Sequence, residues 1–254
     1  MILQKRPLND DGLFIYVNIC YNLGKSRRQP MKIILESKEA EIVEKKSRFI
    51  ANIAAAASEE EATKFIENIK KKYYDARHNC YAYIIGEDGN KKKCSDDGEP
   101  QRSAGMPMME VLESQGYFDI VAVVTRYFGG TLLGVGGLIR AYQGALTEGL
   151  SASITGEIHE GFRAKYRFGY DFYGKIKYIA ESESVVIEDT VFDDMVTISL
   201  IFKKGESERL QKKLTEETNA NIEKLFLEKI KYITVNNKWY GEYSIEKSFN
   251  FEDL

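Results

Sequence analysis

The sequence from residue 120 to residue 140 reads IVAVVTRYFGGTLLGVGGLIR, and it decides the fold expected for the first half of the chain. Ile120–Val124 is continuously apolar, which predicts a strand buried on both faces. The strand ends in Thr125–Phe128 and a glycine-rich turn. A helix is expected from about residue 138 to residue 152, with its small and apolar residues facing inward. This order predicts an α+β domain in which helices cover a sheet.

The sequence before this stretch supplies further strands and helices. Residues 33–57 contain two strand-like runs with a turn near residues 44–46. Ser58 begins a helix, because Glu61 follows three residues later as in a capping box. Residues 78–86 alternate as a strand does. A long polar loop is expected over residues 91–105, and Pro107 suits the first turn of the next helix.

After residue 155 the pattern restarts as β-α-β-β-α-β, which is the signature of a ferredoxin-like fold. We therefore expect two domains, one over residues 31–155 and a ferredoxin-like domain over residues 160–236. Met31 is the expected natural start, which makes residues 1–30 an extension or a tail. Residues 237–254 mix aromatic and charged side chains and are expected to form a C-terminal tail.

The composition is that of a soluble globular protein, with 254 residues, 43% hydrophobic and 30% charged. The net charge of −3 excludes nucleic-acid binding through overall charge alone, so any RNA contact needs a local basic patch. No apolar run approaches the roughly 20 residues that span a bilayer. The cysteines Cys20, Cys80 and Cys94 include no Cys-x-x-Cys pair, which predicts a reducing, cytoplasmic location.

Clustered carboxylates give the first candidate site. Asp96, Asp97 and Glu99 surround Gly98, and such a cluster can bind a hard cation or transfer protons. The alternative is a turn in which the aspartates bond to their own backbone. His78, Cys80 and Cys94 could ligate zinc or form a catalytic Cys–His pair, but a fourth metal ligand is not evident. We assign no catalytic residue, metal site or cofactor.

The glycines before the helix give the second candidate site, since backbone N–H groups at a helix start can bind phosphate. The alternative is a strand-to-helix turn that needs glycine for close packing. Basic and aromatic side chains, including Arg102 and Tyr83, can converge there to stack on bases or dock on a protein, or they can form surface ion pairs. The candidate binding residues are Asp75, Arg77, His78, Asn79, Tyr81, Asp96, Asp97, Glu99, Arg126, Tyr127, Gly129, Gly130, Gly134, Gly136, Gly137 and Arg140.

Several of these motifs together resemble those of the IMPACT/YigZ family. The resemblance rests on Lys46–Ala51, Asp75–Tyr83, Ser95–Pro100, Ala104–Pro107, Thr125–Gly130 and Gly134–Tyr142. It implies a first domain like domain IV of elongation factor G and a small-subunit ribosomal protein. It also implies a second domain like domain V of the same factor. One departure is Arg102, which stands where the family typically has glycine.

The resemblance also implies a function in translation, because eukaryotic relatives regulate translation during amino-acid starvation and bacterial relatives are thought to bind nucleic acid or the ribosome. The expected function is that of a non-enzymatic, cytoplasmic regulator of translation or stress response. Its expected partners are RNA, the ribosome or a translation-related protein, and no membrane. The alternative is a metal- or nucleotide-dependent hydrolase that uses the Asp96, Asp97 and Glu99 loop with His78.

Overall fold

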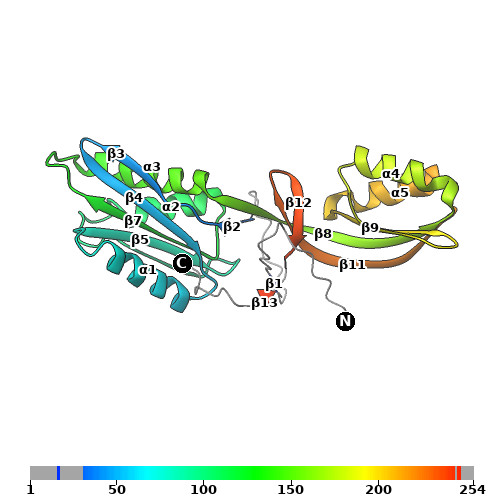
Figure 1. The fold of residues 1–254 in the computed structure, drawn as a ribbon, viewed down its shortest axis with the longest axis horizontal. Coiled ribbons are helices and arrows are strands. Elements are labelled where there is room, and N and C mark those ends of the chain that lie inside the picture. The colour runs from blue at the N-terminus through cyan, green and yellow to red at the C-terminus, as the bar shows by residue number, and fades with distance from the viewer. Residues whose placement is uncertain (1–15, 18–30, 244, 247–254) are drawn as a thin grey trace. The chain divides into compact units, whose positions relative to one another are not determined.

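The computed structural model describes residues 16–17, 31–243 and 245–246 (Figure 1). It confirms the α+β class and divides the chain into two compact units, with a boundary between Glu157 and Ile158. Most of the predicted extension over residues 1–30 lies outside the described residues. The exception is β1 (Tyr16–Val17), which pairs antiparallel with β13 (Ile245–Glu246).

The first unit contains a five-stranded antiparallel sheet with the strand order β3-β4-β7-β5-β6. Helix α1 contacts one face of the sheet, and α2 and α3 lie on the opposite face (Figure 1). The bounds are β2 Met31–Glu36, β3 Ala40–Glu44, β4 Ser47–Ala55, α1 Glu59–Lys72, β5 His78–Ile85, β6 Lys91–Ser95, α2 Gly105–Gln115, β7 Ile120–Tyr127 and α3 Val135–Ala152.

Local sequence signals explain the central elements of this unit. Strand β7 is buried from Ile120 to Arg126, as its apolar run predicts. At the start of α1, the Glu61 N–H donates to Ser58 Oγ at 3.2 Å, while Glu61 Oε2 accepts from the Ala57 N–H at 2.7 Å. The cap thus forms, although the return bond goes to the residue before Ser58.

Two local expectations were wrong. The predicted loop over residues 91–105 begins with the edge strand β6, which among the described strands pairs only with β5. Its sequence lacks apolar alternation because lysines are well tolerated on an edge that faces solvent. In addition, three strands rather than the expected two precede α1, because residues before Ala40 form the separate strand β2. Lys32 of β2 makes a parallel bridge with Tyr117.

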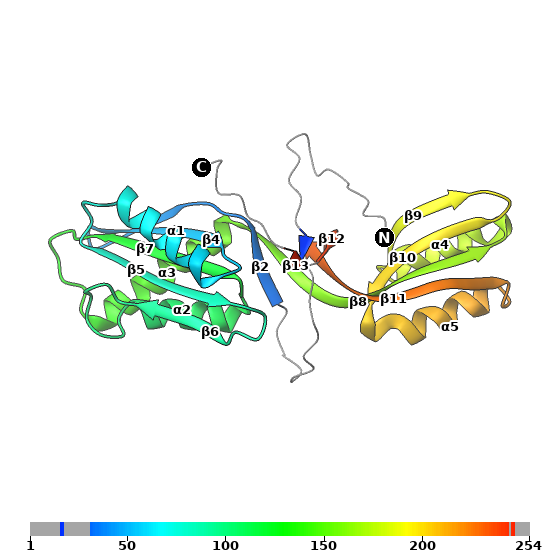
Figure 2. The ribbon, with the colours of Figure 1, turned by 90° about the horizontal axis from the view of Figure 1, so that it is seen from below.

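The second unit has the ferredoxin-like order β8-α4-β9-β10-α5-β11, with the strands arranged β11-β8-β10-β9 (Figure 2). Strand β12 then pairs antiparallel with the end of β11, so the predicted tail begins with a strand. The bounds are β8 Ile154–Phe168, α4 Tyr173–Ser182, β9 Val186–Phe192, β10 Val196–Lys203, α5 Ser207–Glu217, β11 Ile222–Val235 and β12 Lys238–Glu242, with 3-10 turns at Tyr170–Phe172 and Lys204–Glu206.

The two faces of this second sheet differ in character. Tyr166 and Leu200 belong to the core cluster that also contains Ile176 of α4 and Leu210 of α5. On the opposite face Arg163 forms ion pairs of 2.7–2.8 Å with Glu188 and Glu228. Among the described residues, no helix in either unit is both long enough and apolar enough to cross a membrane.

A matched pair of glycine substitutions tests the packing of this sheet. A Cβ on Gly161 would lie 2.4 Å from the carbonyl oxygen of Phe202, whereas a Cβ on Gly174 in α4 would meet no atom within 4 Å. Gly161→Ala should therefore lower the free energy of unfolding by at least about 1–3 kcal/mol. Gly174→Ala should raise it by about 0.5–1 kcal/mol. Urea unfolding of both variants measures the difference, and equal effects would contradict the packing described.

Candidate functional site

Most of the predicted binding residues lie at one end of the first unit, the left-hand end in Figure 1. The strand register brings them there, because Arg48 pairs with Tyr127, His78 with Arg126, and Tyr81 with Ser95. The starts of β4 and β5 therefore lie beside the ends of β6 and β7. We call this surface the loop end, and define it by residues 45–46, 73–77, 96–104 and 128–137.

Asp96 holds the loop that leads into α2. Its Oδ1 accepts from the N–H groups of Ala104 and Gly105 at 3.0 and 2.9 Å, and its Oδ2 accepts from the Arg102 N–H at 2.8 Å. The N-cap residue of α2, Ala104, has no side chain able to cap the helix. Asp96 therefore supplies the missing acceptor for the first N–H groups of the helix.

Asp97 and His78 tie the same loop to β5 and α1. Asp97 Oδ1 accepts from Lys70 Nζ at 2.6 Å, and Oδ2 accepts from the Asn79 N–H at 2.8 Å. His78 Nδ1 lies 2.9 Å from the carbonyl oxygen of Asp97. Since a carbonyl only accepts, Nδ1 carries the proton in this contact. The Asn79 side chain is buried, and its Oδ1 accepts from Thr125 Oγ1 at 2.7 Å.

Glu99 and Arg126 form a buried ion pair of 2.7 Å, with side-chain exposures of 3% and 7%. Tyr142 of α3 donates to the same Glu99 oxygen at 2.9 Å. The Arg126 guanidinium carbon lies 5.4 Å from the ring centre of Phe49 and 5.6 Å from that of Phe128. Arg126 Nε has no hydrogen-bond partner among the described residues. Arg126 is thus an internal residue rather than the surface cation that its sequence position suggests.

Cys80 adjoins this ion pair and is buried. Its Sγ donates to the carbonyl oxygen of Asp96 and lies 3.3 Å from the Tyr142 hydroxyl. Burial raises the pKa of the Cys80 thiol well above its usual range, and burial likewise raises the pKa of Tyr142. A catalytic cysteine needs the opposite shift, toward the thiolate. The hypothesis of a Cys–His pair therefore gains no support.

The three carboxylates are accordingly occupied. Both oxygens of Asp96 and Asp97, and Oε1 of Glu99, accept hydrogen bonds from the loop and its neighbours. No group of three metal-ligating side chains occurs in the described part of the chain. The geometry matches the turn interpretation of the cluster and gives the alternative hydrolase no pair of free carboxylates.

The glycines divide into two groups with different surroundings. Gly129 lies against the β3–β4 turn, because a Cβ there would be 2.0 Å from the backbone carbon of Lys46, and its N–H donates to buried Ser47 Oγ at 3.1 Å. Gly130 and Gly134 have open space and positive φ angles of 84° and 70°. Close packing thus explains Gly129, whereas Gly130 and Gly134 lie in the exposed segment that leads into α3.

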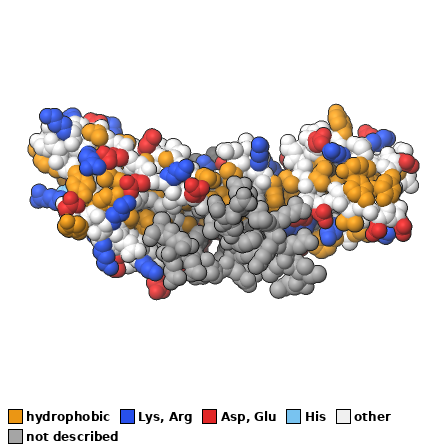
Figure 3. All heavy atoms as spheres, viewed as in Figure 1, with side chains coloured by type: hydrophobic (Ala, Val, Ile, Leu, Met, Phe, Trp, Pro, Cys, Tyr) orange, Lys and Arg blue, Asp and Glu red, His pale blue; other side chains and the backbone are white. Residues whose placement is uncertain are grey.

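The exposed part of the loop end is basic and apolar. A Cβ on Gly136 would lie 3.8 Å from Arg140 Nη1, so this guanidinium lies beside the first turn of α3. Gly137 is half-buried in the same turn. Phe128 and Leu132 are 55% and 83% exposed. Figure 3 shows Lys and Arg side chains at this outer end, with hydrophobic atoms between them.

Asp75 and Tyr127, two further predicted residues, interact with each other. Asp75 Oδ1 accepts from the Tyr127 hydroxyl at 2.6 Å, and this bond raises the pKa of Tyr127 to about 12. Arg48 lies 5.5 Å from the Tyr127 ring centre. Tyr81 is half-buried on β5.

The sequence interpretation missed Ser47, Lys70 and Tyr142 as members of this network. Each is separated from its partner by 27 or more residues, so no local spacing reveals the contact. One signal was available for Tyr142, which lies one residue after inward-facing Ala141 and carries a hydroxyl that needs a buried partner.

The buried ion pair gives a direct test. Glu99→Gln removes the charge that balances Arg126, so we expect a loss of about 3–5 kcal/mol in the free energy of unfolding. The matched control is Glu113→Gln, which breaks an exposed pair with Lys92 and should cost less than about 1 kcal/mol because solvent screens it. Denaturant unfolding compares them, and a Glu99→Gln cost as small as the control's would contradict the assignment.

Two family models match this chain, one in each unit. The family model for the Impact N-terminal domain matches residues 45–150, and the model for the Domain of unknown function (DUF1949) matches residues 167–221. Among solved structures, one titled as that of the two-domain translational regulator Yih1 aligns at a TM-score of 0.33 and 22% identity, over 57% of each chain.

Two curated bacterial proteins show the extent of the similarity. IMPACT family member YigZ of Escherichia coli (strain K12) is 45% identical over 113 residues, which is 44% of this chain and 55% of that protein. IMPACT family member YvyE of Bacillus subtilis (strain 168) is 39% identical over 187 residues, which is 74% of this chain and 86% of that protein. With a relative matched over most of its length at this identity, the chain belongs to the IMPACT family.

Proposed function

We propose that this protein is a cytoplasmic, non-enzymatic regulator of translation that binds RNA of the translation machinery through the loop end. Family membership supports the process, since IMPACT relatives are associated with the control of translation. The loop end supports the mode of action, because its polar interior is committed to internal contacts and its exterior presents cations. The observation that carries the proposal is this separation of buried carboxylates from exposed, unpaired cations.

The cations of the loop end are free to meet phosphate. Six exposed Lys and Arg side chains lie in or next to the loop end and form no ion pair in the described part of the chain: Lys45, Lys46, Lys71, Arg77, Arg102 and Arg140. Two of the nearby acids are paired with cations, Asp97 with Lys70 and Glu99 with Arg126, while Asp75 accepts from the neutral Tyr127 hydroxyl. A local positive surface therefore exists on a chain whose net charge is −3, which suits contact with an RNA backbone.

The start of α3 adds a second source of positive potential. Its N-cap residue, Gly134, makes no side-chain hydrogen bond, so the first N–H groups of the helix stay available to an anion. The Arg140 guanidinium lies beside this turn. Phe128, 55% exposed, and Tyr74, 86% exposed, provide rings on which unpaired bases can stack.

Co-sedimentation with purified ribosomes tests the proposal. The double variant Arg77→Ala with Arg140→Ala should bind at least about tenfold more weakly and lower the salt slope of binding by about 2, one for each lost phosphate contact. The control is Lys91→Ala with Lys93→Ala, which removes the same charge from exposed positions on edge strand β6 and should bind as the wild type does. Equal weakening by both double variants would show that the effect comes from the net charge of the chain and not from the loop end.

Two further outcomes overturn the proposal. Wild-type protein that stays in the supernatant at low salt does not bind ribosomes at all. Binding that survives the double arginine substitution lies on another surface. A mixed-sequence single-stranded RNA as a second probe separates direct RNA contact from contact with a ribosomal protein, since only direct contact gives the same loss on both probes. Addition to a cell-free translation reaction then measures regulation, and it should change the yield only for variants that bind.

A further inference from the structure

An unpaired strand edge remains in the second unit. Strand β11 pairs with β8 on one side, and β12 covers its other side only over residues 232–235. From residue 222 to residue 230, no described strand pairs with that outer side. Figure 2 shows β11 at the margin of this sheet. An open edge presents N–H and C=O groups that another strand can bind.

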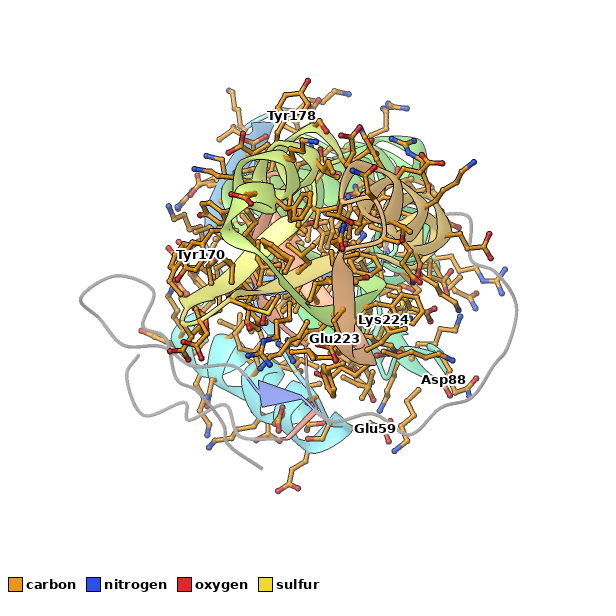
Figure 4. All side chains as sticks on the ribbon, turned by 90° about the vertical axis from the view of Figure 1, so that its right-hand side faces the viewer. Glu59, Asp88, Tyr170, Tyr178, Glu223 and Lys224 are labelled. Atoms are coloured by element: carbon orange, nitrogen blue, oxygen red, sulfur yellow. The ribbon has the colours of Figure 1, made fainter. Side chains whose placement is uncertain are left out.

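The side chains of this edge are unusually apolar for one that faces solvent. Leu225, Phe226 and Leu227 follow one another and are 47%, 41% and 39% exposed. Glu223 and Lys224 precede them, and Glu228 and Lys229 follow. Figure 4 shows Glu223 and Lys224 on β11, below the two helices in that view. Protected edges in monomeric proteins commonly carry inward charges, bulges or proline rather than three successive large apolar residues.

The charges that flank the apolar residues are arranged in mirror order. If two copies of the strand run antiparallel with Phe226 opposite Phe226, Leu225 of each copy lies opposite Leu227 of the other. In the same register Lys224 lies opposite Glu228, and Glu223 lies opposite Lys229. Every charged residue from 223 to 229 then faces its opposite charge, and such cross-strand pairs stabilise a sheet.

Three other edge strands of the two sheets, β9, β6 and β3, lack this property. Strand β9 carries Glu188 and Asp189, and an antiparallel copy centred on Asp189 would place two carboxylates together. Strand β6 carries Lys91–Lys93, and β3 carries only acidic charges, at Glu41 and Glu44. These three edges repel their own copies, which is a common protection against edge-to-edge association. The charges of β11 attract instead.

We propose that residues 223–229 of β11 pair antiparallel with the same segment of a second copy of this chain, forming a symmetric dimer. The interface is isologous, so one twofold axis passes beside Phe226 and the two sheets join into one. Glu223 and Lys229 form no ion pair among the described residues, and Lys224, which donates to Gln211 Oε1 of α5 at 3.5 Å, turns away from that helix in the dimer to meet Glu228 of the other copy. Glu228 has one oxygen on Arg163 and keeps its second for Lys224 of the other copy.

Complementary charge variants test the pairing. Variant A carries Lys224→Glu and Lys229→Glu, which leaves four acids on the edge. Variant B carries Glu223→Lys and Glu228→Lys, which leaves four lysines. Each variant alone should be monomeric, because every charged pair becomes repulsive. An equimolar mixture of A and B should form a heterodimer, because all four pairs become attractive again.

Sedimentation equilibrium of the full chain, over a range of concentrations, gives the readout. The wild type should move from 29.0 kDa toward twice that mass as concentration rises, and A or B alone should raise the dissociation constant at least about tenfold. The control Lys177→Glu with Lys203→Glu makes the same change in charge as A, away from the edge, and should dimerise as the wild type does. Recovery of the dimer in the mixture of variants A and B shows that both variants are folded.

Three results would overturn the proposal. One is a wild-type mass of 29.0 kDa at every concentration. Slow amide hydrogen exchange over residues 223–229 in such a monomer would then show that another segment of the same chain covers the edge. The second is a dimer that A and B leave intact, which places the interface elsewhere. The third is A and B that are monomeric both alone and when mixed, although thermal unfolding shows them folded.

Discussion

The buried pair between Glu99 and Arg126 is the constraint on which the first unit depends. It lies where β7 ends, and it joins that strand to the loop after β6, to α3 through Tyr142 and to β4 through Ser47. A buried charge is stable only with a partner, so these four segments must meet in one arrangement. The consequence reaches the surface, because Glu99 is turned inward and does not pair with the exposed Lys and Arg side chains of the loop end.

Sequence patterns were sufficient where structure is set by neighbours along the chain. The apolar run before Thr125, the capping residues of α1 and the β-α-β-β-α-β order each predict an element that the structure contains. They failed at β6, since lysines on an edge strand give no alternation of burial. They also failed for Arg126, whose partner is 27 residues away. A long-range pair of this kind has no local signature.

Arg102 shows how a local departure is accommodated. Its φ angle is +60°, in the left-handed region that favours glycine, which is the residue that the family resemblance leads us to expect at this position. The Arg102 N–H donates to Asp96 Oδ2, a bond to a charged acceptor that helps to hold the strained conformation. The loop therefore keeps its backbone path, and the side chain adds a cation to the exposed surface.

The two proposed surfaces lie on different units and use different physics. The loop end attracts by charge, so its contacts weaken with salt. The edge of β11 adds backbone hydrogen bonds and apolar contacts to its charge pairs, and salt screens these added contacts far less. A dimer joined at β11 would carry two loop ends, and the second would bind at the effective concentration fixed by the first. Weak phosphate contacts of a single chain would then suffice for retention on a large RNA, provided that both loop ends can reach it at once.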